Sequence, residues 1–219
     1  MSYKIDHLVF GCNNLIEGTS YIEDLFKIKL SNIGYHKTFG THNRVLKIGN
    51  IYLEVIALDP KSKVDKSNSF FDLNNHYVKE NILKDPRLIS FVISSDTCMK
   101  SPFYLQPYYV ERGLYKWNFY RPNSKKIDKK IFSYPDAFPS VINWFSHSPI
   151  KDLQNNLFSF ESLEINLNKN QSDYKNFLEK FNLKEKIIFK FSQKRVMYDL
   201  PRLRARIIDK KNKKVIFIQ

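Results

Sequence analysis

The sequence is poor in the residues that build several common kinds of site. It has 6 glycines and contains neither a phosphate-cradling glycine loop nor a Gly-x-Ser-x-Gly elbow. Its 2 cysteines, Cys12 and Cys98, form no disulfide framework and do not have zinc-site spacing. No apolar run approaches the roughly 20 residues that span a bilayer, and the amino terminus lacks a signal-peptide layout. We therefore expect a reduced, cytoplasmic protein with no nucleotide cofactor and no membrane partner.

Acidic residues are scarce relative to basic ones, with 22 Asp and Glu against 36 Lys and Arg, which gives a net charge of +14. Such a balance can mark contact with nucleic acid. In the densest basic cluster Arg202, Arg204 and Arg206 alternate with apolar residues, and a period of two places them on one face of a strand. A solvated strand face is the favoured interpretation, with a polynucleotide groove as the alternative. We expect a small-molecule ligand rather than a nucleic acid as the partner.

Three sections of the chain repeat a similar order of strands and helices. Residues 1–60 predict a βαβββ module, in which apolar residues at helical spacing mark the helix and glycine turns separate strands. Residues 61–86 form a polar connector. Residues 87–150 predict a second, degenerate module without a clear long helix, and residues 151–219 predict a third βαβββ-like section of the same structural unit. The predicted helices cover 13–30 and 172–182, and the predicted strands cover 4–11, 31–39, 42–49, 51–58, 87–95, 114–122, 138–146, 159–167, 186–191, 195–200, 202–209 and 214–219.

One acid, Glu54, stands in the middle of the apolar run NIYLEVIALDP, residues 50–60. A strand this apolar usually buries both faces, and a buried carboxylate is costly unless something pairs with it. Two interpretations stay open. Glu54 either forms a salt bridge or marks a bulge at a sheet edge, or it is a ligand or catalytic acid on the wall of a cleft.

A tandem βαβββ order that opens with DHLVFGCNNL and closes with GNIYLEVIALDP resembles the vicinal oxygen chelate superfamily. The longer stretch GYHKTFGTHNRVLKIGNIYLEVIALDP is similar to the glyoxalase-like domain branch, and LYKWNFYRP, INWFSHSP and SLEINL follow in the order of that branch. The resemblance implies an α+β fold of tandem modules, whose curled mixed sheets form an open cup around a divalent metal. Because the superfamily includes isomerases, lyases, ring-cleaving dioxygenases and antibiotic-resistance proteins, the fold does not name a reaction.

In the metal-binding members, one ligand comes from the first strand of a module and another from its last. His7 and Glu54 occupy the matching positions, and strand alternation lets both line one concave wall. An imidazole and a carboxylate there would give half of a site for Zn, Fe, Mn or Ni. The later sections show no matching pair, so the second half of the ligand set is missing, and His36 and His147 are the further candidates.

The GTHN stretch, residues 40–43, supplies His42 as the candidate proton carrier, since imidazole titrates near neutrality. The alternative for this stretch is turn chemistry, with Gly40 at positive φ and local backbone bonds from its polar side chains. Arg44 could orient an anionic substrate or lie on a solvated face. The candidate substrate-binding residues are Asn43, Arg44, Tyr52 and Trp117.

The resemblance implies a divalent-metal-dependent enzyme of the lyase, isomerase or dioxygenase type, acting on a small carbonyl or hydroxyl compound. The alternative is a non-catalytic protein of the same fold that binds or sequesters a small molecule without metal, and the incomplete ligand set argues for it. Superfamily cups are often completed across subunits, but this chain carries more than one module. Both a monomer and a homodimer are therefore compatible with the sequence.

Overall fold

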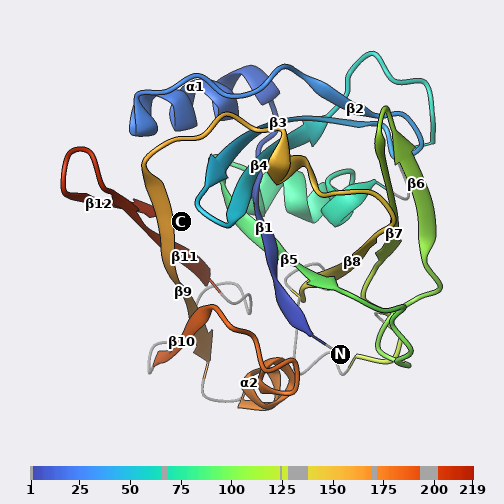
Figure 1. Cartoon of the computed structure of the whole chain (residues 1–219). Helices are drawn as coiled ribbons and strands as arrows, with labels where there is room; N and C mark the ends of the chain where they lie inside the picture. The colour runs from blue at the N-terminus through green and yellow to red at the C-terminus, as the bar shows by residue number, and fades with distance from the viewer. Residues whose placement is uncertain (1, 66–68, 124, 128–137, 169–171, 193–201) are drawn as a thin grey trace.

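The computed structural model describes residues 2–65, 69–123, 125–127, 138–168, 172–192 and 202–219 (Figure 1). Its helices and strands are β1 (Tyr3–Gly11), α1 (Leu15–Phe26), β2 (Gly34–His36), β3 (Thr41–Ile48), β4 (Ile51–Leu58), β5 (Arg87–Ser95), β6 (Tyr108–Arg112), β7 (Tyr115–Tyr120), β8 (Ser140–Trp144), β9 (Phe158–Asn168), α2 (Ser172–Glu179), β10 (Lys186–Ser192), β11 (Arg202–Asp209) and β12 (Lys214–Ile218). Short helical turns cover Phe70–Asp72, Val78–Ile82 and Pro149–Lys151. Neither α-helix in the described part has the length and apolar character that a bilayer crossing requires.

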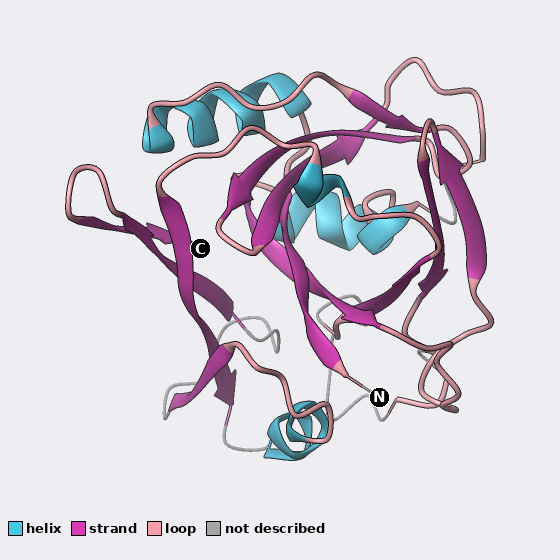
Figure 2. Ribbon diagram, in the orientation of Figure 1, coloured by secondary structure: helices cyan, strands magenta, loops and turns pink. Residues whose placement is uncertain are grey.

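Eight strands form one mixed sheet in the order β2-β3-β4-β1-β5-β8-β7-β6. The central strand β1 runs parallel to β4 and antiparallel to β5, and β5 runs parallel to β8. The sheet is strongly curled (Figure 2). Its two edge strands approach each other, since Arg112 on β6 lies 3.1 Å from His36 on β2. The expected α+β fold with a curled mixed sheet is confirmed.

Helix α1 covers the outer face of this sheet. Its amino end is capped by Asn14, whose Oδ1 accepts a hydrogen bond from the N–H of Ile16 at 2.8 Å. Leu15, Ile22 and Phe26 form its buried stripe. Gly18 lies against β4 and the residue after β1, and an added Cβ would stand 2.5 Å from Sγ of Cys12. A larger residue at position 18 would therefore push the helix away from the sheet.

The remaining strands form a second sheet in the order β10-β9-β11-β12, with α2 connecting the parallel strands β9 and β10. Two arginines of the face expected on β11, Arg204 and Arg206, are paired with acids of β9, Glu164 and Glu161. Nη1 of Arg206 lies 2.6 Å from Oε2 of Glu161, and the guanidinium of Arg204 lies 3.8 Å from the centre of the Phe217 ring. The strand predicted over 195–200 lies outside the described residues.

One strand, β6, was not predicted from the sequence. It forms a hairpin with β7 through a two-residue turn, in which Gly113 has a φ of 59°. The sequence YYVERGLY, with a glycine between two β-prone segments, carried the signal for this hairpin. The omission matters because Arg112, at the end of β6, reaches into the cup.

Candidate functional site

The inner face of the eight-stranded sheet lines a cup beneath the turn Phe70–Asp72. Parallel pairing places His7 of β1 directly beside Tyr52 of β4 and Val9 beside Glu54. His7, Tyr52 and Glu54 therefore share one face, as the alternation of both strands predicts. The cup is lined by His7, His36, Asn43, Tyr52, Glu54, Phe70, Phe71, Arg112, Trp117, Phe119, Ile142 and Trp144.

A β-bulge on β1 brings a second acid, Asp6, into contact with this group. The pairing of β1 with β5 shifts between Ile5 and His7, so the strict alternation of faces is interrupted at Asp6. Oδ1 of Asp6 lies 2.8 Å from Nδ1 of His7, and Oδ2 accepts a hydrogen bond from Nε1 of Trp144 at 2.9 Å. Asp6 thereby fixes the orientation of the imidazole, whose Nε2 is left facing the cup.

His7 lies between Asp6 and Glu54. Its Nε2 is 3.6 Å from Oε2 of Glu54, which is beyond hydrogen-bond length. Its ring stacks on Tyr52 with the centroids 4.5 Å apart. Burial raises the pKa of Tyr52 well above its usual value, and the charges of Asp6 and Glu54 raise it further, so the phenol stays protonated.

The other oxygen of Glu54 begins a chain of hydrogen bonds across the cup. Oε1 of Glu54 accepts from Nδ2 of Asn43 at 2.5 Å. Oδ1 of Asn43 in turn accepts from Nη1 of Arg112 at 3.0 Å. The side-chain amide of Asn43 therefore hydrogen-bonds both to the buried carboxylate of Glu54 and to the guanidinium of Arg112, which comes from the opposite edge of the sheet. Each of these two groups thus has a polar partner.

The same Nη1 of Arg112 lies 3.1 Å from Nε2 of His36. Because a guanidinium only donates, Nε2 of His36 must be the acceptor, and its Nδ1–H then donates to Oγ1 of Thr41 at 3.0 Å. Burial lowers the pKa of His36 well below its usual value, and the charge of Arg112 lowers it further. The hydrogen-bond pattern and the lowered pKa both indicate that His36 is neutral at pH 7.

These contacts bear on the divalent metal that the fold implies. His7 and Glu54 face the cup together, and the contact of Asp6 with Nδ1 of His7 leaves Nε2 of that ring available. Nε2 of His36, however, is occupied by Arg112. In the parts of the chain that the structure describes, no three His, Cys, Asp or Glu side chains are grouped as a metal ion requires. Where further metal ligands would be needed in the cup, the second half of the chain contributes the cationic side chain of Arg112. The donor set present does not fit a four-ligand metal site.

The remaining candidates lie in different places. Trp117 lines the cup with Asn43 and Tyr52. His42 and Arg44 point to the opposite side of β3 and line a separate pocket on the outer face of the sheet. His147 is not among the residues that line the cup; it is exposed, and its Nε2 lies 2.7 Å from Oδ2 of Asp152.

Aromatic side chains fill most of the cup. We call Phe70 and Phe71 the aromatic plug; Phe70 stacks on Phe39 with the centroids 3.9 Å apart and meets Phe119 edge-on at 4.7 Å. Asp72, the next residue, accepts a 2.7 Å hydrogen bond from Arg121. The space left in the cup is about 30 Å³, which holds water but no organic molecule.

Asp6 and Arg112, which hold His7 and the Asn43–Glu54 pair in place, were not predicted as site residues. Asp6 stands next to His7, and an acid adjacent to a candidate ligand was a visible signal, but alternation assigned it to the other face. Arg112 belongs to the strand that was not predicted. Its arrival beside β2 depends on the curl of the whole sheet.

The fold and the sequence agree with known proteins. The sequence matches the glyoxalase-like domain family over residues 5–179. A hypothetical protein from Staphylococcus aureus has a similar structure, with a TM-score of 0.69 and 15% identity over 99% of this chain and 98% of that one.

Two methylmalonyl-CoA epimerases are more distant. The Streptomyces coelicolor enzyme, solved with 2-nitronate-propionyl-CoA, has a TM-score of 0.44 and 12% identity over 65% of this chain and 98% of its own. The Mycobacterium tuberculosis enzyme has a TM-score of 0.44 and 9% identity over 68% of this chain and 91% of its own. No curated protein matches the sequence. The chain belongs to the glyoxalase-like domain family of the vicinal oxygen chelate superfamily.

Proposed function

We propose that the chain binds a small hydroxyl or carbonyl compound with an apolar body in the cup, and that it does so without a divalent metal. The observation that carries this proposal is the hydrogen-bond chain from Glu54 through Asn43 to Arg112. It puts a guanidinium where a metal site would need further ligands. A positive charge held there disfavours a metal ion by direct repulsion.

The chemistry of the cup supports a ligand of this class. A ligand hydroxyl placed beside Nε2 of His7 and Oε2 of Glu54, which lie 3.6 Å apart, can donate a hydrogen bond to the carboxylate. The walls beside it are Trp117, Trp144 and Phe119, which suit an apolar ring. A ligand occupies this space when the aromatic plug moves aside.

The metal part of the proposal is tested by titrating Zn²⁺, Mn²⁺, Fe²⁺ and Ni²⁺ into protein purified without chelator, with calorimetry and elemental analysis as readouts. We expect no stoichiometric ion at micromolar concentration. The opposite result is one tightly bound ion per chain that is lost in both Glu54→Gln and His7→Gln, and it would establish the metal-dependent function instead.

The ligand part can be read from intrinsic fluorescence, because the 2 tryptophans of the chain both line the cup. Phenol is the probe, and toluene, which has the ring without the hydroxyl, is its matched control. We expect phenol to change the fluorescence saturably and toluene to bind about tenfold more weakly, since one buried hydrogen bond to a charged group contributes about 1.5–3 kcal/mol. Equal binding of the two, or no binding of either, contradicts the proposal.

A second candidate function is metal-independent proton transfer. The pairing of Asp6 with Nδ1 of His7 favours it, because a carboxylate in this position orients an imidazole for acid–base work on its other nitrogen. Incorporation of deuterium from D₂O into a bound probe ketone such as phenylacetone, followed by NMR, would distinguish it from binding alone. Exchange that is lost in His7→Gln while the probe still binds supports an enzyme, and no exchange above the solvent rate supports a binding protein.

A further inference from the structure

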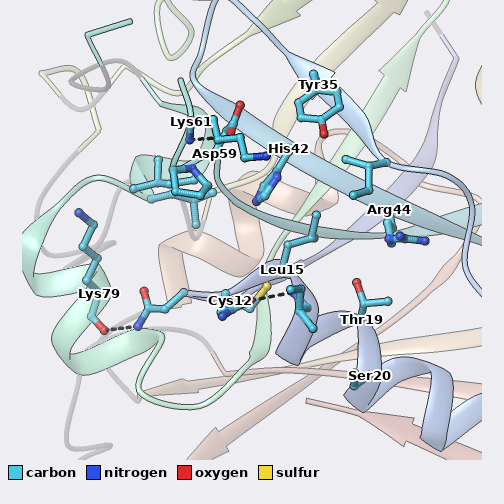
Figure 3. A pocket seen from close by; sticks show the side chains of 17 residues that line it. Cys12, Leu15, Thr19, Ser20, Tyr35, His42, Arg44, Asp59, Lys61 and Lys79 are labelled. Carbon is cyan, nitrogen blue, oxygen red and sulfur yellow. Dashed lines mark hydrogen bonds between the residues drawn. The ribbon is translucent and has the colours of Figure 1, made fainter. Parts of the chain in front are cut away.

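The outer face of the sheet carries a second pocket that the cup does not explain. On β3, Asn43 lines the cup and Thr41 contacts His36 on the same side, whereas His42 and Arg44 turn outward. Their outward side chains, helix α1 and the segment after β4 enclose a pocket of about 750 Å³ (Figure 3). This is ample for an organic molecule, in contrast to the filled cup.

Positive charge predominates around this pocket. Arg44, Lys61 and Lys79 line it, against one carboxylate, Asp59. Nη1 of Arg44 donates to the backbone carbonyl of Ser31 at 2.9 Å, which holds the guanidinium in place. A fixed arginine with neighbouring lysines attracts an anionic group and can bind it through charge-assisted hydrogen bonds.

The same pocket exposes large apolar side chains. Ile16 is 75% exposed and Tyr35 is 48% exposed, and Ile33 joins them on the rim. Leu15 and Leu58 continue this surface into the pocket. Apolar surface of this kind is favourably removed from water by an apolar partner. The pocket thus combines an apolar floor and rim with cationic side chains.

One buried polar group in the wall is also unsatisfied. Thr19 of α1 is buried, and its Oγ1 has no hydrogen-bond partner in the described part of the chain. Buried hydroxyl groups are normally paired. Thr19 lines the pocket beside Leu15, across from Arg44 and His42 (Figure 3). Because this oxygen is buried, the Thr19 side chain would have to rotate toward the pocket to meet a polar atom of a ligand.

We propose that this outer pocket is a second binding site, for an organic anion with an apolar body. The anionic group lies at Arg44, with Lys61 adding positive charge from across the pocket, and the apolar body covers Leu15, Ile16 and Tyr35. The site is on the opposite side of the sheet from the cup and uses none of its residues, so it does not depend on the function proposed for the cup.

Octanoate is the probe, measured by isothermal titration calorimetry, with octanol and octylammonium as matched controls of the same chain length. We expect octanoate to bind at least about tenfold more tightly than octanol, because a charge-assisted contact distinguishes them. Octylammonium should bind most weakly. If octanoate fails to bind at millimolar concentration, or if octanol binds equally well, the proposal is wrong.

Substitutions of the lining residues test where the anionic group binds. Arg44→Gln and Lys61→Glu should each weaken octanoate binding by about tenfold or more, whereas Lys63→Gln, an exposed lysine in the same segment outside the pocket, should not. Lys61 is exposed, so its replacement tests the site even if Arg44→Gln is unstable. Octanoate should also leave the tryptophan fluorescence unchanged, since both tryptophans line the cup. Unaltered affinity in both pocket variants, or a fluorescence change that tracks binding, would overturn the assignment.

Discussion

Nη1 of Arg112 on β6 hydrogen-bonds to Nε2 of His36 on β2, at 3.1 Å, and so links the two ends of an eight-stranded sheet. These strands are the first and last in the hydrogen-bonded order of that sheet. The cup is therefore closed by side chains at the point where a barrel would be closed by a backbone ladder. Closure of this kind depends on a few residues, which makes it sensitive to single substitutions.

Replacing Arg112 should open this seam. Arg112→Met removes the hydrogen bonds to Asn43 and His36 and leaves Glu54 without a nearby cation, so we expect a loss of about 2–3 kcal/mol in the free energy of unfolding. Urea unfolding of this variant measures the loss. Lys116→Met, on an exposed position of the neighbouring β7, is the control. A change as small as that of the control would show that the seam contributes nothing to stability.

Gly34 tests the same seam from the other side. A Cβ added there would stand 2.5 Å from Oδ1 of Asn43 and 2.6 Å from Nη1 of Arg112. Gly34→Ala should therefore displace the guanidinium and cost about 1–3 kcal/mol of unfolding free energy. Gly113→Ala has open space around it and a φ of 59°, so it should cost about 1 kcal/mol through backbone strain alone.

The two glycine variants differ most clearly when Arg112 is already absent. Combined with Arg112→Met, the effect of Gly34→Ala should shrink, while that of Gly113→Ala should persist. Additive effects for Gly34 would mean that the alanine methyl does not act through the arginine.

The stability of the protein should depend on pH through His36. Its pKa is lowered in the folded state, mainly by burial, so the unfolded chain takes up a proton near pH 6.5 that the folded chain does not. The unfolded state then binds more protons below that pH, and stability falls as the pH drops, by up to about 1.4 kcal/mol per pH unit. Unfolding of the wild type and His36→Gln between pH 7 and 5 should show a shallower slope in the variant. His76→Gln, at an exposed position, should keep the slope of the wild type; equal slopes for all three proteins would refute the assignment.

The two cysteines should differ in reactivity. Burial raises the pKa of Cys12 to about 12, and its Sγ donates to the carbonyl of Ile56, whereas Cys98 is exposed. At pH 8 only about one in 10⁴ of the Cys12 thiols is ionised, so reaction with a disulfide reagent should be confined to Cys98 in the folded protein. A time course with 5,5′-dithiobis(2-nitrobenzoate) should show one fast thiol, and Cys98→Ser should remove it. Two fast thiols in the wild type would indicate that α1 separates readily from the sheet.

Part of the site could be predicted because it depends on strand alternation. His7 and Glu54 lie on neighbouring parallel strands in matched register, and the period of two in each strand was enough to place them together. Applied to β3, the same rule separates Asn43, which faces the cup, from His42 and Arg44, which face outward. Their proximity in the GTHN motif had suggested that His42 and Asn43 belong to one site, but adjacent residues of a strand point to opposite faces of the sheet.

The rest depends on interactions that a single strand does not encode. Asp6 contacts His7 because a bulge in β1 interrupts the alternation, and the bulge is set by pairing with β5. Arg112 enters the cup because the sheet curls over eight strands, and twist accumulates over distances that local patterns do not report. Asn43 and Arg112 are 69 positions apart in the sequence, yet they are joined by one 3.0 Å hydrogen bond.

The aromatic plug has a consequence for the rates of binding. Phe71 and the following Asp72 both have positive φ, at 54° and 50°, conformations that cost non-glycine residues about 1–2 kcal/mol each. The plug is therefore held under strain over a cup that it occupies, and a ligand can take its place only after the plug has moved. The observed rate of binding should then rise with ligand concentration and level off at the opening rate of the turn Phe70–Asp72. The opening of the protein would then limit how fast a ligand enters the cup, and Phe70→Ala should raise the maximal rate of binding.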